Sequence, residues 1–329
     1  MDRQKTVFSG LQPTGNIHLG NYLGALRNWV RLQDDYQTVY CVVDLHAMVT
    51  DYDPAEYSRD RLEAAKVLLA CGIDPERSLF YYQSEVPQHV ELSWMLATMT
   101  PMGVLNRMTQ YKDKSAKGVA ANLGLFAYPV LMAADIMVHH AHLVPVGDDQ
   151  RQHLEVTRDL VERFNNRFGE VFPIPDALIP ETSARVMSLT EPTAKMSKSD
   201  VNERSRVLLL DPPDVVRRRI RSAVTDSEPT VRHDWDQKPG VSNLLEIMSG
   251  ATRRPIPELV DEYGASGYGR FKEAVAEAVD QMLDPIRTAY AELDDADVTA
   301  VMTEGAEAAR ASAEGFQRRA RAAMGLSGR

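Results

Sequence analysis

The chain has little cysteine and lacks any long apolar run. Its only two cysteines, Cys41 and Cys71, lie far apart and form none of the paired spacings of a zinc or iron–sulfur site. No stretch approaches the roughly 20 apolar residues that span a bilayer. The opening segment MDRQKTVFSG lacks the apolar stretch of a signal peptide. We therefore expect a protein of the reducing cytoplasm, with no metal held by protein side chains and no membrane partner.

The chain also lacks the excess of positive charge that marks a general nucleic-acid binder. It has 37 basic and 47 acidic residues, which gives a net charge of −10. An acidic balance favours solubility and argues against RNA binding as the sole role, although it permits a local basic patch. The apolar share of 44% is ordinary for a globular protein, and 329 residues suffice for two domains with buried cores.

The first half of the chain alternates strand-like and helix-like segments. Apolar runs rich in β-branched and aromatic residues at 6–10, 38–47 and 78–84 predict buried strands. Between them, 21–33 and 58–72 have helical spacing, and the second has a serine at its start and a glycine at its end. This alternation predicts an α/β fold with a Rossmann-like, doubly wound parallel sheet, which binds ligands beyond the carboxyl ends of its strands.

The second half of the chain has a different texture. From about residue 190 strand-like runs nearly vanish, and the segments are rich in alanine and charge with helical periodicity. We therefore expect an all-helical domain after the sheet domain, with the boundary near the polar segment EPTAKMSKSDVNERS at 191–205. Lys195 and Lys198 stand there among small hydroxyl residues. Such a segment is either a solvated turn or a lid that binds an anionic ligand.

A second polar segment, SGLQPTGNIHLGNYLG at 9–24, joins the first predicted strand to the first predicted helix. It matches neither the glycine pattern of dinucleotide-binding folds nor the P-loop. Its glycines nevertheless let a nucleotide approach the backbone, and a helix that begins near Gly20 favours phosphate at its N-terminus. His18 and Asn21 can donate to phosphate oxygens. The alternative is a structural turn in which His18 caps or packs.

Together the two segments resemble a known pair of signatures. HLGN at 18–21 and KMSKS at 195–199 resemble the HIGH and KMSKS motifs of class I aminoacyl-tRNA synthetases. Further stretches resemble the bacterial tryptophanyl branch of that class: VDLHA, YPVLMAADI, VPVGDDQRQHLEVTRDLVERFN, SAVTDSE and KPGVSNLLEI. The resemblance runs from about Phe8 to the last predicted helix. Asn21 stands where the wider class has a second histidine, but asparagine is usual in this branch.

The resemblance implies ATP-dependent attachment of L-tryptophan to its tRNA. The carboxylate of tryptophan would attack the α-phosphate of ATP, giving tryptophanyl-adenylate and pyrophosphate, and the terminal ribose of the tRNA would then take the acyl group. Such phosphoryl transfer needs positioning and cationic stabilisation. Lys195 and Lys198 suit that role, with Gln12 and His18 as the other implied catalytic residues. Mg²⁺ would be bound through the ATP phosphates.

The resemblance also implies a domain plan. Residues 1–190 would form the catalytic domain, with an insertion around 86–135 at the interface of a homodimer. Residues 191–205 would form a mobile loop that closes over the departing pyrophosphate. Residues 206–329 would form the helical domain that binds the tRNA anticodon, together with the C-terminal helix. Arginine clusters in that half are either tRNA contacts or solvated helix faces.

Carried over by motif, the resemblance implies two sets of site residues. Asp135 would accept the indole N–H, which is a donor only. On the sequence alone, an intramolecular ion pair or a cap is the alternative for this acid in an apolar setting. Asp148 and Asp149, implied on the ribose and adenine side, can also cap a helix. The implied ATP-binding residues are Gln12, Pro13, Thr14, Gly20, Asn21, Gly147, Asp148, Asp149, Val186, Lys195, Met196, Ser197, Lys198 and Ser199. The implied tryptophan-binding residues are Asp135, Phe8, His46, Tyr128, Met132, Val144, Val146 and Gln150.

Three other functions fit part of the sequence. A tyrosyl-tRNA synthetase shares the expected fold and both signatures, and only the resemblance of GDDQRQHLEVTRDL and AVTDSE favours tryptophan. A nucleotidylyltransferase uses a similar histidine–glycine motif but ordinarily lacks the lysine segment and a long helical tail. A noncatalytic RNA-binding paralogue would have lost lysines or pocket residues, and this sequence retains them.

Overall fold

A computed structural model describes residues 5–13, 15–109, 122–147, 150–179, 185–198 and 200–326. One parallel sheet has the strand order β3-β2-β1-β4-β5. Its strands are β1 (Thr6–Leu11), β2 (Gln37–Val42), β3 (Ser78–Tyr82), β4 (Leu143–Pro145) and β5 (Asp176–Leu178). The order reverses between β1 and β4, which confirms the predicted doubly wound sheet. Ligands bind such sheets beyond the carboxyl ends of the strands, at the point of reversal.

The sheet separates two hydrophobic cores, because successive side chains of a strand point to opposite faces. On β2, Tyr40 and Val42 belong to one core, whereas Val39 and Cys41 belong to the other. The first face is covered by α1 (Leu19–Asn21), the π-helical turn η1 (Tyr22–Leu26), α2 (Arg27–Asp35) and α4 (Pro54–Ala70). The second face is covered by α5 (Gln88–Ala97), α6 (Met102–Asn106), α8 (Leu123–Val138) and α9 (Arg151–Phe168).

The second strand is shorter than its apolar run suggests. The run at 38–47 predicts one strand, but β2 ends at Val42 and the short helix α3 (Asp44–Ala47) follows. A continuous apolar run fits a buried helix as well as a buried strand. Here the Asp44 carboxylate accepts from the backbone N–H of Ser84 at 2.9 Å, just after β3, which holds the chain in its turn away from the sheet.

The helix α4 begins earlier than the sequence pattern indicates. The expected serine cap at Ser58 lies inside the helix, which starts at Pro54. Asp53 is the N-cap, and its carboxylate accepts from the backbone N–H of Ala55 and Glu56. Aspartate followed by proline is the stronger start signal, because the carboxylate satisfies open N–H groups and proline lacks an N–H to satisfy.

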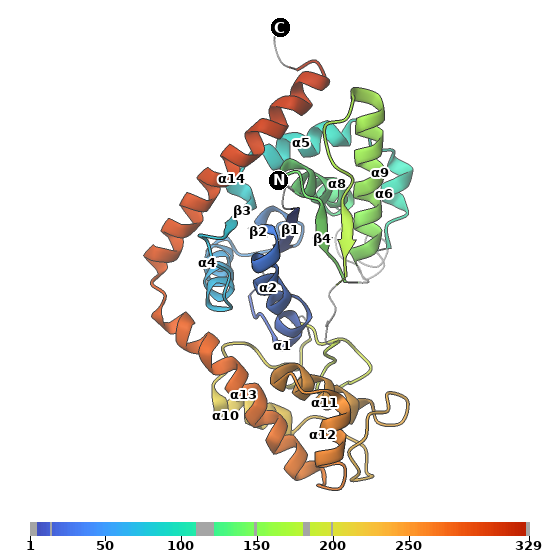
Figure 1. Ribbon diagram of the computed structural model, residues 1–329, viewed down its shortest axis with the longest axis vertical. Helices are drawn as coiled ribbons and strands as arrows, with labels where there is room; N and C mark the ends of the chain where they lie inside the picture. Colours follow the sequence, from blue (N-terminus) through green and yellow to red (C-terminus); the bar gives the residue numbers. More distant parts are fainter. Residues whose placement is uncertain are drawn as a thin grey trace.

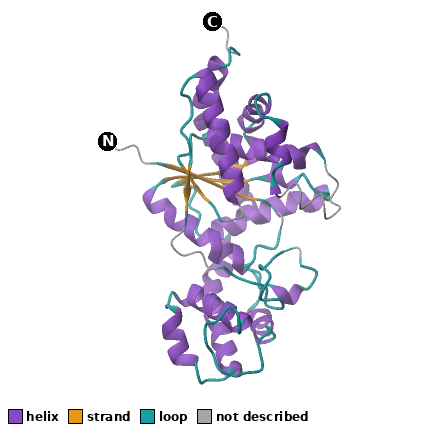
Figure 2. Cartoon of the chain, turned by 90° about the vertical axis from the view of Figure 1, so that its right-hand side faces the viewer, coloured by secondary structure: helices purple, strands orange, loops and turns teal. Residues whose placement is uncertain are grey.

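The described chain after β5 is helical apart from loops, as the sequence predicts. A bundle contains α10 (Pro213–Arg221), α11 (Pro239–Thr252), α12 (Ile256–Tyr263) and α13 (Tyr268–Glu292). A short 3₁₀ turn at Glu203–Ser205 precedes it, and another, at Gln83–Glu85, follows β3 in the sheet part. Figure 2 shows this bundle at one end of the molecule and the strands toward the other. The domain boundaries at residues 190 and 205 stay predictions.

The last helix, α14 (Asp295–Ala323), leaves the bundle and returns along the sheet part of the molecule (Figure 1). It packs against β3, α4 and α5. A β-carbon at Gly305 would lie 1.8 Å from the Phe80 carbonyl oxygen, so only glycine lets the helix lie this close to the strand. The C-terminal helix therefore belongs spatially to the sheet part. Within the described ranges, no helix combines the length and apolarity needed to cross a membrane.

Candidate active site

A cavity of about 440 Å³ opens at the carboxyl ends of β1 and β4, where the strand order reverses. Four pieces of chain contribute to its lining: β1 and the residues after it, α3 and the residue before it, the later part of α8, and the stretch from β4 to the N-cap of α9. All eight residues implied for tryptophan are among the lining residues. They are Phe8, His46, Tyr128, Met132, Asp135, Val144, Val146 and Gln150, joined by Ser9, Gly10, Gln12, Val43, Ile136 and Pro145. The structure thus gathers the whole predicted set in one place.

Asp135 is the single acid among the described residues that line this cavity. Its side chain is only 2% exposed. Its Oδ1 accepts from Nε2 of Gln83 at 2.7 Å and from Nδ1 of His89 at 2.8 Å, and its Oδ2 lies 2.7 Å from Nε2 of His46. A carboxylate offers about four acceptor positions. These three partners therefore leave one position on Oδ2.

The surroundings keep Asp135 ionised. Burial alone raises the pKa of this carboxyl, but the charge and hydrogen bond of His46, together with the hydrogen bond of His89, outweigh it and hold the pKa well below its usual range. An ionised carboxylate only accepts hydrogen bonds. The predicted intramolecular ion pair is therefore present, and the same acid lines the cavity, while its role toward the indole N–H stays a prediction.

The rest of the cavity is mainly apolar with polar edges. Phe8, Val144 and Val146 are buried hydrophobic residues of its wall. Tyr128 meets the His46 ring edge-on, with ring centroids 6.2 Å apart, and its hydroxyl lies 2.5 Å from Nε2 of His153. A mainly apolar cavity lined by one ionised acid suits an aromatic ring that carries one N–H donor.

The two polar segments singled out from the sequence lie side by side. The backbone N–H of Met196 donates to the Val186 carbonyl at 3.2 Å. Next to it, Lys195 forms an antiparallel bridge with Met187. Gly20 lies against Val186, because a β-carbon at Gly20 would be 3.6 Å from the Val186 side chain and 3.1 Å from the His18 ring. The structure therefore brings Gly20, Val186 and Met196 of the implied ATP site together.

His18 lies buried between these segments. Its backbone N–H donates to Oδ1 of Asn21 at 3.0 Å, so the local capping contact exists. Burial, followed by the nearby cations Arg206, Lys195 and Lys198, lowers the pKa of His18 to about 4, so its ring is neutral at pH 7. Among the described residues, no group forms a hydrogen bond with its Nδ1. A neutral ring with an open nitrogen, close to three cations, suits an oxygen of an anionic ligand.

The other implied ATP-binding residues occupy the same edge of the sheet or lie outside the described residues. Pro13 and Gly147 come shortly after β1 and β4, and Gln12 lines the cavity. Ser197 and Lys198 follow Met196 on the lysine segment. The residues outside the described ranges are Thr14, Asp148, Asp149 and Ser199.

Sequence reasoning missed several residues that contact these sites. Gln83 and His89 both donate to Asp135, and Arg206 is buried near His18. Gln83 directly follows β3, and polar residues at the ends of parallel strands are typical of binding sites, so that signal could have found it. His89 and Arg206 carry no comparable signal, because only the fold brings them to their partners.

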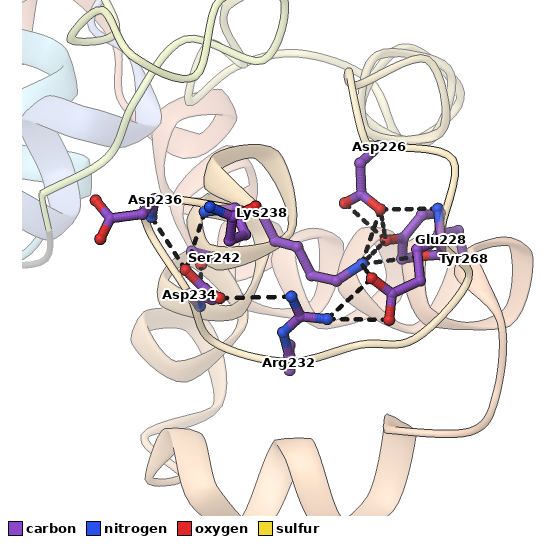
Figure 3. Close-up of polar contacts among 9 residues, drawn as sticks. Asp226, Glu228, Arg232, Asp234, Asp236, Lys238, Ser242 and Tyr268 are labelled. Atoms are coloured by element: carbon purple, nitrogen blue, oxygen red, sulfur yellow. Dashed lines mark hydrogen bonds and ion pairs between the residues drawn. The ribbon is translucent and has the colours of Figure 1, made fainter.

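A second buried charge, Lys238, lies in the helical bundle (Figure 3), and it does not line the cavity. The Lys238 side chain is 1% exposed. Its ammonium donates to Oδ1 of Asp226 at 2.7 Å, to the Glu228 carbonyl at 2.9 Å and to the Tyr268 hydroxyl at 2.9 Å. Burial alone lowers the pKa of Lys238, but the bonds to Asp226 and Tyr268 outweigh it and raise the pKa above its usual range. All three ammonium protons have acceptors, which indicates a structural role.

The sheet, its reversal point and the paired motif segments define the class of protein. A model of the family described as tRNA synthetases class I (W and Y) matches residues 1–284, and the chain belongs to this family. A tryptophan–tRNA ligase of Caldanaerobacter subterraneus subsp. tengcongensis is 50% identical over 98% of this chain and 98% of its own. The tryptophanyl-tRNA synthetase structure from Mycoplasma pneumoniae has a TM-score of 0.89 and 33% identity over 98% of both chains. The Campylobacter jejuni structure complexed with ADP and tryptophan has a TM-score of 0.85 and 37% identity over 98% of this chain and all of that one.

Proposed function

We propose that this chain is an enzyme that attaches L-tryptophan to its cognate tRNA with ATP, through a tryptophanyl-adenylate, in the cytoplasm. The observation that carries the proposal is Asp135, a buried ionised acid with one open acceptor position at the end of a mainly apolar cavity. The indole N–H supplies the single donor that this position needs. The names of the Caldanaerobacter and Campylobacter relatives favour tryptophan over tyrosine, the other substrate of the family.

The first step joins tryptophan to AMP. A carboxylate oxygen of tryptophan forms a bond to the α-phosphorus of ATP while the bond to the bridging oxygen of the β-phosphate breaks, and pyrophosphate leaves with that electron pair. Lys195, Lys198 and Arg206 supply positive charge where the leaving group gains negative charge. The neutral His18 ring and the Asn21 side chain position phosphate oxygens beside Gly20, which lies against the His18 ring.

Two ligands complete the reaction. Mg²⁺ enters bound to the ATP phosphates as part of the substrate and adds charge neutralisation there. In the second step a ribose hydroxyl at the 3′ end of the tRNA attacks the acyl carbon of the adenylate, and AMP leaves. The helical bundle is the proposed binding site for the anticodon, because sequence-specific recognition of RNA uses unpaired loops.

One arginine cluster of the bundle is partly structural. Arg217 pairs with Glu273 at 2.8 Å, and Arg219 is largely buried against Asp211. The exposed Arg221 at the end of α10 is therefore the better candidate for a phosphate contact. Arg221→Glu should weaken tRNA charging and reduce its salt dependence while ATP–pyrophosphate exchange continues. Unchanged charging at every salt concentration would assign this arginine to a solvated helix face.

A homodimer is part of the proposal. Four apolar side chains are exposed on α5, α6 and α8, which pack on one another, and all lie between residues 86 and 135. They are Val90, Trp94, Met102 and Leu123, with Trp94 74% exposed. Exposed apolar groups of this size mark interaction surfaces. Trp94→Asp should convert the protein to a monomer in sedimentation velocity, whereas the exposed Ile179→Asp, outside this region, should not.

The experiment that tests the proposed function is amino-acid-dependent ATP–pyrophosphate exchange with each standard amino acid. We expect exchange with tryptophan and not with tyrosine. Exchange driven by tyrosine alone would overturn the specificity, and no exchange with any amino acid would overturn the activity. Charging of a tryptophan tRNA transcript then tests the second step separately.

A further inference from the structure

A run of buried hydrogen bonds leads from Asp135 to groups that do not line the cavity. Nδ1 of His89 lies 2.8 Å from Oδ1 of Asp135, and Nε2 of His89 lies 2.9 Å from the Tyr81 hydroxyl. The same hydroxyl lies 2.7 Å from Nε2 of His139. His89, Tyr81 and His139 are all buried, and none of the three lines the cavity that Asp135 faces. They come from α5, β3 and the end of α8, so three separate elements converge behind one acid.

The chemistry of these groups fixes the direction of the protons. An ionised Asp135 only accepts, so Nδ1 of His89 carries a proton and donates to Oδ1. When the His89 ring holds that proton alone, its Nε2 is an acceptor. The Tyr81 hydroxyl has one proton, which it donates to that Nε2, and its oxygen then accepts from Nε2–H of His139. Burial lowers the pKa of His139 well below its usual value, which keeps this ring uncharged. Each member thereby sets the proton position of the next.

The far end of the run reaches the C-terminal helix. Nδ1 of His139, left as an acceptor, lies 3.5 Å from the Ser312 hydroxyl on α14, at the limit of a hydrogen bond. The strong contacts are thus the three between Asp135 and His139. The aromatic rings also pack on one another, with centroid distances of 5.7 Å between Tyr81 and His89 and 5.4 Å between Tyr81 and His139. Rings held by both packing and hydrogen bonds cannot turn without breaking contacts.

We infer that His89, Tyr81 and His139 are positioning residues for substrate selection, an inference that rests on the proposed function. They hold Oδ1 of Asp135 away from the cavity with a donor of fixed tautomer, so the open acceptor position of Oδ2 stays directed at the ligand N–H. Without the Tyr81 hydroxyl, Nε2 of His89 loses its donor and the ring is free to place its proton there. Oδ1 of Asp135 then keeps only Gln83 of its two N–H partners, and the carboxylate can rotate toward other donors.

The variant Tyr81→Phe tests this inference, with Tyr40→Phe as the matched control. Tyr40 is equally buried on the neighbouring strand β2, its hydroxyl donates to the Trp29 carbonyl at 2.6 Å, and it faces the opposite core. The readout is the ratio of kcat/KM in ATP–pyrophosphate exchange for tryptophan and for its analogue with sulfur in place of the indole N–H. In Tyr81→Phe we expect this ratio to fall about threefold to tenfold, through a raised KM for tryptophan, with the KM for ATP unchanged.

Both variants should lose thermal stability, because Tyr81→Phe removes two buried hydrogen bonds and Tyr40→Phe removes one, but only Tyr81→Phe should change the ratio. An unchanged ratio in Tyr81→Phe would overturn the inference and leave the run of hydrogen bonds as core structure. A wild-type protein that does not prefer tryptophan to the sulfur analogue would instead overturn the proposed role of Asp135. The two failures are therefore distinguishable.

A second pair of variants, at His89, tests the inference independently if Tyr81→Phe does not fold. His89→Leu removes the donor to Asp135, whereas His89→Asn keeps an amide N–H near the position of Nδ1. We expect His89→Leu to lower the preference for tryptophan and His89→Asn to restore part of it. Equal ratios in these two variants would contradict a role for the His89 donor.

Discussion

Asp135 and Lys238 are both buried charges, and they differ in how completely the protein satisfies them. Lys238 has three protons and three acceptors, supplied by Asp226, the Glu228 carbonyl and Tyr268. Asp135 has about four acceptor positions and three donors, and its last position lies at a cavity. The closed set indicates a structural charge and the open set a binding site, because an unsatisfied buried group is costly until a ligand completes it.

Replacing the exposed cation Lys195 should have the largest effect on activity with little effect on stability. Lys195 is exposed, and it is one of the cations that lower the pKa of His18, whereas Lys238 is buried among its acceptors. Lys195→Ala should slow adenylate formation by about 2 to 4 kcal/mol in activation free energy, the scale of losing one preorganised stabilising group. The free energy of unfolding and the affinity for tryptophan should barely change. Stopped-flow measurement of adenylate formation, beside equilibrium tryptophan binding, checks this. Weak tryptophan binding with normal chemistry would contradict it.

The closed charge should show the reverse pattern. Lys238→Met leaves Asp226 and Tyr268 without their cation. Breaking a fully buried pair costs about 3 to 5 kcal/mol, and partial exposure of Asp226 reduces this to about 2 to 3 kcal/mol in the free energy of unfolding. Urea unfolding measures the loss, with Lys66→Met as the control, because the carboxylate that partners Lys66 is 66% exposed. Pyrophosphate exchange per folded molecule should be unchanged. A large loss of exchange activity would break the distinction between the two regions.

Removing the open acid should act on selectivity. A hydrogen bond to a charged acceptor contributes about 1.5 to 3 kcal/mol, so Asp135→Ala should lower kcat/KM for tryptophan roughly ten- to a hundredfold. The KM for ATP should be nearly unchanged. Most of the preference for tryptophan over the sulfur analogue should disappear with the carboxylate. If wild type and variant prefer tryptophan equally, Asp135 is a structural acid like those around Lys238.

Acid titration gives the smallest expected effect. Burial raises the pKa of Asp226, but Lys238 and Tyr268 outweigh it and lower the pKa from 3.8 to about 2. A folded pKa below the unfolded value means that Asp226 stabilises the fold above about pH 4 and that this contribution is lost as the pH falls from about 4 to about 2. Urea midpoints should therefore show Asp226→Asn less stable than wild type at pH 5 and converging with it near pH 2. Parallel curves for the two proteins across this range would contradict the assignment.

Local sequence determined the elements and the motif segments of this protein. Alternating strand and helix patterns set the parallel sheet, because apolar period and run length are read from neighbouring residues. The parts that local pattern misjudged were boundaries, such as the end of β2 at Val42, where a continuous apolar run does not distinguish strand from helix. The eight residues implied for tryptophan were predicted from a resemblance and not from hydrophobic periodicity. The fold places all eight around one cavity.

Only the tertiary structure decided which charges meet. Asp135 is joined by His46, Gln83 and His89 from three other elements, and its ionised state depends on the histidines. Likewise Arg206 reaches His18 only because the chain after the lysine segment pairs with residues beside His18. A single sequence records each of these side chains but not their distances. Burial and hydrogen bonding depend on contacts between residues that are distant in the sequence. The pKa of a buried group, and whether the protein satisfies all of its hydrogen-bond positions, are therefore decided only in the folded chain.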